Sequence, residues 1–403
     1  MRILPGDPKN GRIEYLQSRP QALDCHGNNH IHAVREFNSR QVVNSVLGAG
    51  PAEPDHFAAN PMTDSYFSSV FRDAFAGKNV MITGGLGFIG SHLARRLAAL
   101  GARLVLVDSL IPAYGGNIFN IQGIEDQVQV NVADVRDEHG MLYLVSGRDY
   151  IFNLAGQVSH IDSMEDPYTD LEINVRSQIS TLEACRKRNP GVKIIYTSTR
   201  QLYGKPDYLP VDEKHLAHPT DVNGINKLAG ELYHILYYNV YGIRTVSLRL
   251  TNTYGPGQLI KHNRHGFIGW FIRKIIEGEE IEVYGDGTQI RDFNYVDDVA
   301  DALLLAAVSE EANGEIYNLG GDQPICLKNL VELMIDINGG GSYRLIPFPA
   351  NKKRIDVGDF YGQYAKITTT LGWRPKTSLR QGLEQTLTYY RRNLAHYLDN
   401  GGN

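Results

Sequence analysis

The stretch KNVMITGGLGFIGSHLARRLAAL, residues 78–100, decides the fold of this chain. It starts with a short apolar run of strand length, continues through a turn rich in glycine, and ends in a pattern that places three leucines on one helical face. Glycine lets the backbone of such a turn approach a pyrophosphate, and the helix N-terminus offers unpaired N–H groups and a favourable dipole. We therefore predict a dinucleotide-binding turn, with cofactor contacts at Gly84, Gly87, Phe88, Ile89 and Gly90.

The run RLVLVD, residues 103–108, has the character of a second buried strand, and it ends in an acid. The Asp108 carboxylate can accept hydrogen bonds from both adenosine ribose hydroxyls, and it would repel a 2′-phosphate. The sequence therefore predicts NAD as the cofactor in preference to NADP. Asp134 follows the third apolar run, where we expect the adenine to lie.

Strand-like and helical patterns alternate between residues 78 and 250. Helical patterns cover residues 91–100, 171–188 and 227–241. Apolar runs of strand length separate them, at residues 78–83, 103–108, 128–132, 150–155, 192–198 and 244–250. Continuous apolar strands that alternate with helices are typical of a parallel sheet covered on both faces. The pattern predicts an α/β fold with a doubly wound parallel sheet.

We expect three parts along the chain. Residues 1–76 contain six prolines and no clear alternation, so they form an N-terminal extension that is partly irregular. Residues 77–250 form the dinucleotide-binding domain. Residues 251–403 form a smaller substrate-binding lobe, interleaved with that domain, with helices near residues 266–277, 297–308 and 327–337.

The bulk composition excludes several classes of protein. A net charge of −5 and a pI near 6.2 argue against a partner made of nucleic acid or a membrane surface. Three widely spaced cysteines do not make a disulfide framework. No apolar run approaches the ~18 residues of a membrane span, and the N-terminus lacks the apolar stretch of a signal peptide. We expect a cytoplasmic enzyme.

One group of residues in the extension has the types of side chain that bind metals. These are Cys25, His26, His30 and His32. No second group of ligands completes a closed site, so we read the stretch as a polar loop and predict no metal.

Further motifs follow in order: NLAGQVSHIDS at 153–163, Asn174, TSTRQLYG at 197–204, Lys227, LTNTYGPGQ at 250–258 and VYGDGTQIRDFNYVDDVADA at 283–302. With the glycine turn and Asp108, they resemble the extended short-chain dehydrogenase/reductase family, in particular its sugar-nucleotide epimerases and dehydratases. The resemblance covers about residues 77–390. It implies a homodimer that binds NAD and a nucleotide sugar and oxidises a sugar carbon transiently to a ketone.

The resemblance also implies roles for single residues. Thr199 would hold the sugar hydroxyl, and Lys227 would contact the nicotinamide ribose. Relatives have a tyrosine four residues before the lysine as the base, but here that position holds Asn223, which cannot titrate. The further cofactor contacts that we expect are Val135, Leu154, Ala155, Gly156 and Asn174.

Three accounts of Asn223 stay open. Another group is the base, with His160, Asp221, Tyr203 or a water held by Asn223 and Lys227 as candidates. Alternatively, the protein carries out a step on an unusual sugar or nucleoside that needs no tyrosine, such as dehydration or decarboxylation. In the third account, redox chemistry is lost and the protein only binds NAD or a sugar nucleotide.

The pair after Thr199 bears on the reaction. Dehydratases of the family carry acidic residues there, but this chain has Arg200 and Gln201, which favours epimerisation. Arg200 could pair with a carboxylate or phosphate of the substrate. Residues 266–271 and 155–158 resemble the 2-epimerase that makes CDP-tyvelose. The substrate contacts that we expect are Gln157, Arg200, Gln201, Asn252, Val283, Tyr284, Arg291 and Arg354.

Overall fold

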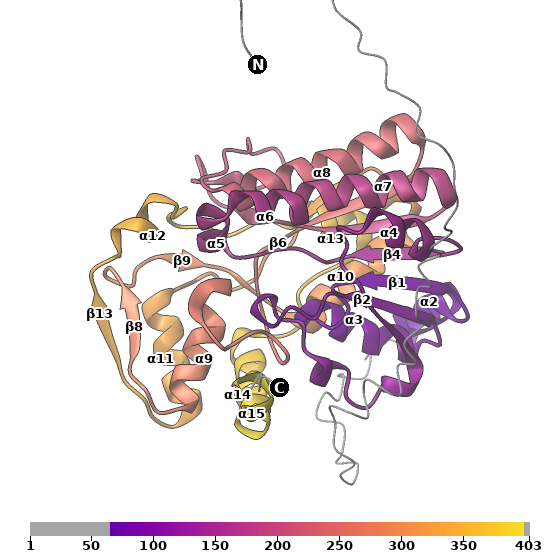
Figure 1. Cartoon of the computed structure of the whole chain (residues 1–403). Helices are drawn as coiled ribbons and strands as arrows, with labels where there is room; N and C mark the ends of the chain where they lie inside the picture. The colour runs from indigo at the N-terminus through magenta and orange to yellow at the C-terminus, as the bar shows by residue number, and fades with distance from the viewer. Residues whose placement is uncertain (1–64, 399–403) are drawn as a thin grey trace, which may run out of the picture. The chain divides into compact units, whose positions relative to one another are not determined.

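The computed structural model of the chain describes residues 65–398 (Figure 1). Most of the expected N-terminal extension, including the group of cysteine and histidine at residues 25–32, lies outside the described residues. Within the described part, no helix is long and apolar enough to cross a membrane.

A seven-stranded sheet of parallel strands forms the centre of the described part, in the order β11-β6-β5-β4-β1-β2-β3 (Figure 1). It confirms the predicted doubly wound α/β fold. The bounds are β1 (Asn79–Thr83), β2 (Arg103–Asp108), β3 (Val128–Val132), β4 (Tyr150–Asn153), β5 (Lys193–Thr199), β6 (Arg244–Leu250) and β11 (Ile316–Asn318). The first six correspond to the six apolar runs. The seventh, β11, comes from the C-terminal part of the chain and was not predicted.

Side chains that alternate along each strand form an apolar layer on each face of the sheet, and these two layers together are the first core. In β1, Val80 and Ile82 belong to one cluster of buried residues, and Met81 belongs to another. Because successive strand residues point to opposite faces, a strand covered on both faces is apolar throughout. One face is covered by α2 (Ser65–Phe75), α3 (Phe88–Ala99) and α10 (Val296–Val308). The other is covered by α4 (Glu138–Leu144), α7 (Ser177–Arg188) and α8 (Val222–Tyr241).

The helix predicted over residues 171–188 is divided into three pieces. It consists of α6 (Pro167–Leu171), a π-helical turn η4 (Glu172–Arg176) and α7. Asp166 begins α6, because its side chain accepts a hydrogen bond from the Thr169 N–H and Pro167 occupies the first turn. A π turn inside a helix is common near functional sites, and this one contains the buried Asn174.

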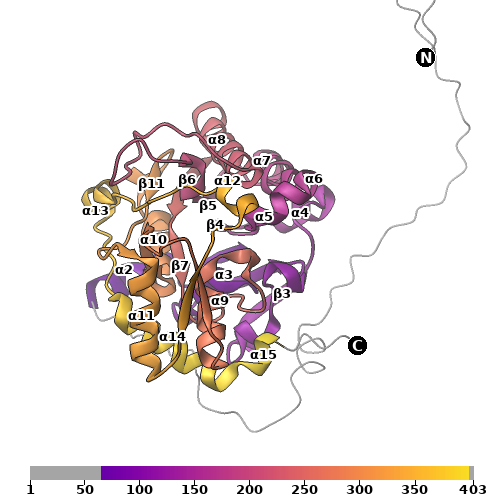
Figure 2. The same ribbon diagram turned by 90° about the vertical axis from the view of Figure 1, so that its left-hand side faces the viewer.

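Residues beyond β6 build a second apolar core and also return to the first. The second core contains α9 (Phe267–Ile276), α11 (Leu327–Asn338) and α14 (Leu379–Asn393), which lie together in Figure 2, with β8 (Ile281–Tyr284). Between these elements the chain goes back to the sheet to form α10 and β11. The two parts are therefore joined by several crossings of the chain, and the carboxyl edge of the sheet faces the second part.

Candidate active site

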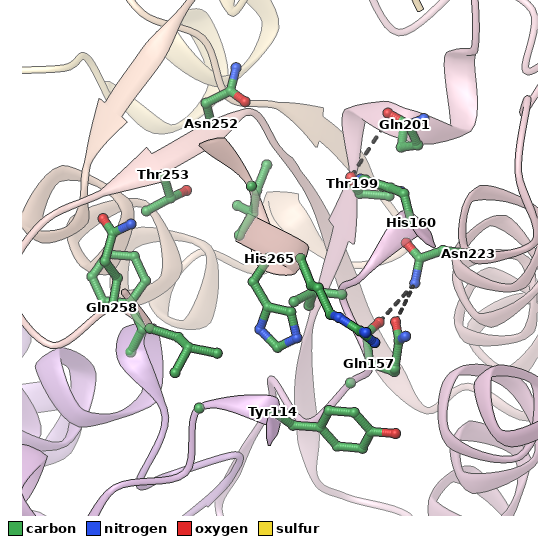
Figure 3. Close-up of a pocket in the computed structure, with 18 of the residues that line it drawn as sticks. Tyr114, Gln157, His160, Thr199, Gln201, Asn223, Asn252, Thr253, Gln258 and His265 are labelled. Carbon is green, nitrogen blue, oxygen red and sulfur yellow. Dashed lines mark hydrogen bonds between the residues drawn. The ribbon is translucent and has the colours of Figure 1, made fainter. Parts of the chain in front are cut away.

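A cavity of about 590 Å³ lies at the carboxyl edge of the sheet and extends to the second core (Figure 3). In open parallel sheets, ligands bind at this edge. Most of the site residues expected from the sequence line the cavity. They are Gly84, Gly87, Phe88, Ile89, Gly90, Asp108, Asp134, Val135, Leu154, Ala155, Gly156, Gln157, His160, Thr199, Arg200, Gln201, Asn223, Lys227, Asn252, Tyr284 and Arg291.

Tyr203 does not line the cavity, which corrects its place among the candidate bases. Its ring is fully buried, its hydroxyl donates to Asn318 Oδ1 at 2.7 Å, and it accepts from Arg249. Burial raises the pKa of Tyr203 to about 12. A phenol enclosed in this way cannot reach a substrate, so its role is to pack.

Three other expected contacts also lie outside the cavity lining. Val283 is fully buried in the second core. Arg354 is exposed at the end of α12 (Ala350–Arg354), and Lys352 of the same basic group lines the cavity in its place. Asn174 is buried behind the wall, where its amide donates to the Gln157 carbonyl at 2.9 Å and so holds the loop after β4.

The backbone of the glycine turn after β1 packs so closely on itself that it leaves no space for side chains. A Cβ on Gly90 would lie 2.1 Å from the Gly84 carbonyl oxygen, and Gly84 adopts a φ of +69°. Helix α3 starts at Phe88, and Gly87 before it supplies no side-chain cap. The first N–H groups of α3 therefore have no side-chain acceptor at the cavity wall, an arrangement that suits a pyrophosphate.

Asp108 lies at the end of β2, beside this turn. Its carboxylate accepts hydrogen bonds from the Leu86 N–H at 3.0 Å and the Leu110 N–H at 2.9 Å, which fix its orientation. Burial raises the pKa of Asp108, and the backbone hydrogen bonds act in the opposite direction. A carboxylate held at this position suits the adenosine ribose, so the cavity end near β2 fits a dinucleotide.

Lys227 projects from α8 toward the end of β5. Its ammonium donates to the Thr197 carbonyl at 2.6 Å and lies 4.6 Å from the centre of the Tyr196 ring. Burial lowers the pKa of Lys227 to about 8. The group is therefore mostly charged at neutral pH and loses its charge in mildly alkaline solution.

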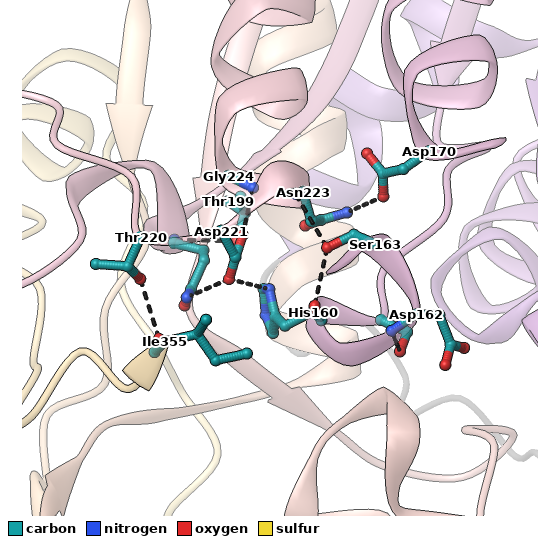
Figure 4. Close-up of polar contacts among 12 residues, drawn as sticks. His160, Asp162, Ser163, Asp170, Thr199, Thr220, Asp221, Asn223, Gly224 and Ile355 are labelled. Atoms are coloured by element: carbon teal, nitrogen blue, oxygen red, sulfur yellow. Dashed lines mark hydrogen bonds and ion pairs between the residues drawn. The ribbon is translucent and has the colours of Figure 1, made fainter. Parts of the chain in front are cut away.

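Asn223, one turn before Lys227, is used to satisfy a buried carboxylate (Figure 4). Its amide donates to Asp170 Oδ2 at 3.0 Å and to the Gln157 carbonyl at 2.8 Å. Asn226, three residues later on the same face of α8, donates to the other Asp170 oxygen at 2.8 Å. Asn223 therefore fastens α8 to the wall of the cavity and offers no acceptor for a substrate proton.

His160 and Asp221 form a close polar pair at the same wall (Figure 4). His160 Nδ1 lies 3.0 Å from Asp221 Oδ2. Asp221 is the N-cap of α8, where its other oxygen accepts from the Gly224 N–H at 2.7 Å, and Gln201 Nε2 donates to Oδ2 at 2.8 Å. Burial acts to raise the pKa of Asp221, but the contacts with His160, Gly224 and Gln201 outweigh it and the net shift is downward. Asp221 is thus a fixed carboxylate behind a histidine that faces the cavity.

His265 and Tyr114 are cavity residues that the sequence analysis missed. Their rings stack with centres 6.4 Å apart, and Figure 3 shows His265 directed into the cavity. Burial lowers the pKa of His265 to about 4, so the ring is neutral at neutral pH. Arg264 beside it donates to Asp162 at 2.7 Å and joins this loop to α5 (His160–Glu165). The segment that contains Arg264 and His265 shows no periodic pattern of apolar residues. Its two histidines, His262 and His265, were the only sequence feature that could have marked it as part of a site.

Comparisons with known proteins agree with this geometry. Residues 80–320 match the NAD dependent epimerase/dehydratase family. A putative UDP-glucose 4-epimerase of Methanocaldococcus jannaschii is 33% identical over 78% of this chain and 99% of its own length. The CDP-paratose 2-epimerase of Salmonella typhi is 28% identical over 76% of this chain and 97% of its own length.

A solved structure is also similar to this chain, in both sequence and fold. The UDP-glucose 4-epimerase of Thermotoga maritima, determined with UDP-glucose, is 33% identical, has a TM-score of 0.71, and matches over 78% of this chain and 99% of its own. The fold and site thus define an NAD-dependent enzyme of the short-chain dehydrogenase/reductase type. The chain belongs to the NAD dependent epimerase/dehydratase family, and NAD is its cofactor.

The lowered pKa of Lys227 leads to a prediction for cofactor binding. We expect the affinity for NAD to fall as the pH rises through about 8, because the ammonium that would contact the nicotinamide ribose loses its proton. Fluorescence titration of the protein with NAD between pH 6.5 and 9.5 measures this change. In Lys227→Met, affinity is lower, by about 10-fold or more, and independent of pH.

Loss of stability at high pH would not explain a fall in NAD affinity, because the contribution of Lys227 to stability changes in the opposite direction. Because the folded-state pKa of Lys227 lies below that of the unfolded chain, this lysine makes the free energy of unfolding rise between about pH 8 and pH 10.5. Thermal unfolding at each pH is the control. An NAD affinity that stays constant through pH 9.5 would contradict the proposed role of the ammonium.

Proposed function

We propose that the protein is an epimerase that acts on a nucleotide-diphosphate sugar by transient oxidation of one sugar carbon. The observation that carries this proposal is the continuous cavity, which joins the glycine turn and Lys227 to Thr199, His160 and Arg291. The similarity to epimerases of UDP-glucose and CDP-paratose supports the class of substrate. When bound, NAD supplies a reversible acceptor for hydride.

His160 replaces the missing tyrosine as the base in this proposal. Since its Nδ1 faces the Asp221 carboxylate at 3.0 Å, its Nε2 is the atom left to accept a proton. His160 takes the proton of the sugar hydroxyl as that carbon is oxidised and returns it when the carbonyl is reduced from the other face. Thr199, which Figure 3 shows on the same side of the cavity, holds the reacting oxygen.

The residues after Thr199 support epimerisation over loss of water. Elimination needs a general acid and a general base near the sugar. The resemblance assigns these roles in dehydratases to acidic residues directly after the threonine, and here those two positions hold Arg200 and Gln201. The Gln201 amide is already engaged with Asp221. These side chains can hold a substrate but cannot protonate a leaving hydroxyl.

A panel of nucleotide sugars tests the proposal. The purified protein, loaded with NAD, is incubated with the UDP, CDP, dTDP and GDP forms of common hexoses, and products are separated by chromatography. We expect a product that differs from its substrate only in configuration. Release of water or carbon dioxide would instead indicate a dehydratase or decarboxylase, and binding without any product would contradict an enzyme acting on these sugars.

Substitution of His160 tests the assignment of the base. His160→Ala should lower turnover by about 10²- to 10⁴-fold, because the proton acceptor is lost. NAD should still bind, since His160 lies away from the glycine turn. Added imidazole should restore part of the activity to His160→Ala, which would not happen if the residue only supported the fold.

Two further variants complete this test. Asp221→Asn keeps an N-cap for α8 but removes the charge behind His160, so we expect reduced turnover. The melting temperature should also fall, because the lowered pKa of Asp221 means that its ionised form stabilises the fold. His139→Ala removes an exposed histidine on α4 and should behave as the wild type. Normal turnover in His160→Ala would refute the assignment.

We also propose that the protein is a homodimer that pairs through α8. Ile225, Leu232, Leu236 and Val240 are each about half exposed, and their spacing places them on one face of the helix. Figure 1 shows α8 and α7 side by side at the border of the described part. A contiguous apolar stripe of this kind is typical of an interface.

Light scattering on the wild type and on the double variant Leu232→Glu, Leu236→Glu tests the dimer. We expect twice the chain mass for the wild type and a monomer for the variant, because two buried carboxylates in each chain would oppose association. Leu345→Glu, an equally exposed leucine of β13 (Tyr343–Ile346), should remain dimeric. A monomeric wild type would refute this interface.

A further inference from the structure

Arg200 is a cation in the cavity wall that the protein leaves largely without partners. Its guanidinium stacks on Phe360, with Cζ 4.9 Å from the ring centre, and Nη2 donates to Asn252 Oδ1 at a long 3.4 Å. Nη1 is buried and has no hydrogen-bond partner. Among residues 65–398, no carboxylate lies within ion-pair distance of this guanidinium.

Arg291, the neighbouring guanidinium, has the opposite character. Its Nη1 donates to the carbonyls of Ile290 and Gly358, and its Nη2 lies 3.4 Å from an Asp356 oxygen. Most of its donors are thus taken by the protein, and a carboxylate faces its charge. Arg291 Nε has no hydrogen-bond partner either, but the ion pair with Asp356 balances the charge of Arg291, so Arg200 is the less engaged of these two arginines.

The buried charge of Arg200 is unfavourable for the folded protein when no ligand occupies the cavity. Burial, and then the nearby Arg291, lower the pKa of Arg200 to about 10, so the guanidinium stays charged at neutral pH. Asp292, Asp356 and Asp221 act in the opposite direction on this pKa, but they compensate the charge only in part. A buried charge that is incompletely balanced destabilises a protein. Neutral sugar hydroxyls would complete the hydrogen bonds of Arg200 but would add no balancing charge, whereas an oxyanion would do both.

The place of Arg200 in the fold puts it beside the sugar. It directly follows Thr199 at the end of β5, and Thr199 pairs with Leu250 at the end of β6. Its contact with Asn252, two residues beyond Leu250, shows that the guanidinium stays at this strand edge. Tyr284 and Lys352 also line the cavity, but they come from the second part of the chain and contact each other at 3.0 Å.

The side-chain oxygen of Asn252 is oriented to accept a hydrogen bond from Arg200. Its amide nitrogen donates to the Asp292 carbonyl at 2.9 Å, which turns its oxygen toward the guanidinium. The stacked Phe360 ring fixes the plane of the guanidinium from one side. Arg200 is therefore held as a planar fork, which is the geometry that binds a carboxylate by two parallel hydrogen bonds.

We propose that Arg200 binds a carboxylate carried by the sugar of the substrate, so that the protein acts on nucleotide-linked acidic sugars. This inference rests on the proposed function, because it assumes that a nucleotide sugar occupies the cavity with its sugar next to Thr199. In this proposal the diphosphate of the substrate is a separate anion, bound toward Lys352 and Tyr284.

Binding measurements test this without requiring turnover. UDP, CDP, GDP and dTDP are first compared by calorimetry on the NAD-loaded protein, and the tightest is taken forward as its glucose and glucuronate derivatives. We expect the wild type to prefer the glucuronate by about 10- to 100-fold. Arg200→Gln should remove this preference while its affinity for the nucleoside diphosphate alone changes by less than about threefold.

Two control variants distinguish binding of the sugar carboxylate from binding of the diphosphate. Lys352→Gln should weaken the nucleoside diphosphate and both sugar derivatives by the same factor, and Arg200→Lys should keep only part of the preference because it lacks the fork. Equal wild-type affinity for glucose and glucuronate derivatives would overturn the proposal, as would an equal loss of affinity for the nucleoside diphosphate in Arg200→Gln.

Failure of the proposed function gives a different result. If the wild type prefers the glucuronate and Arg200→Gln does not, but no sugar is converted, the carboxylate site stands and the epimerase proposal fails. If neutral sugars are epimerised and no preference exists, only the carboxylate site fails.

Discussion

Parallel pairing of the strands is the constraint on which the rest of the structure depends. It brings the carboxyl ends of all seven strands to one edge, so residues from distant parts of the sequence meet there. The glycine turn follows β1, Asp108 ends β2, Thr199 ends β5, and Asn252 lies just beyond β6. Each of these residues is positioned by the short stretch of sequence that ends its own strand. The parallel pairing of the strands then brings the residues together at one edge.

Asn223 is used to hold the wall of the site together. Lys227 and Thr199 line the cavity, but Asn223, one turn before Lys227, donates its amide hydrogens to Asp170 and the Gln157 carbonyl. Asn223 and Asn226 both donate to Asp170, so amide hydrogen bonds satisfy this buried carboxylate. In our proposals, His160 accepts the proton of the substrate and Arg200 binds its negative charge.

The sequence predicts best what depends on local pattern. Apolar runs and the glycine turn located six strands and the cofactor end, whereas β11 has three residues and no period of its own. Which side chain faces the cavity depends on tertiary partners. Tyr203 is turned away because Arg249 and Asn318, far along the chain, hold its hydroxyl. His265 faces the cavity from a loop whose sequence has no periodic pattern that separates cavity-facing from solvent-facing residues.

The hydrogen bonds of Asn223 have a consequence for how this protein could change over evolutionary time. The amide is 2% exposed, and both of its acceptors are themselves enclosed. A side chain without an amide at this position would leave Asp170 and the Gln157 carbonyl with one donor fewer each. A replacement of Asn223 that keeps these groups satisfied therefore requires coordinated replacement of several neighbours, so Asn223 is entrenched by the residues that surround it.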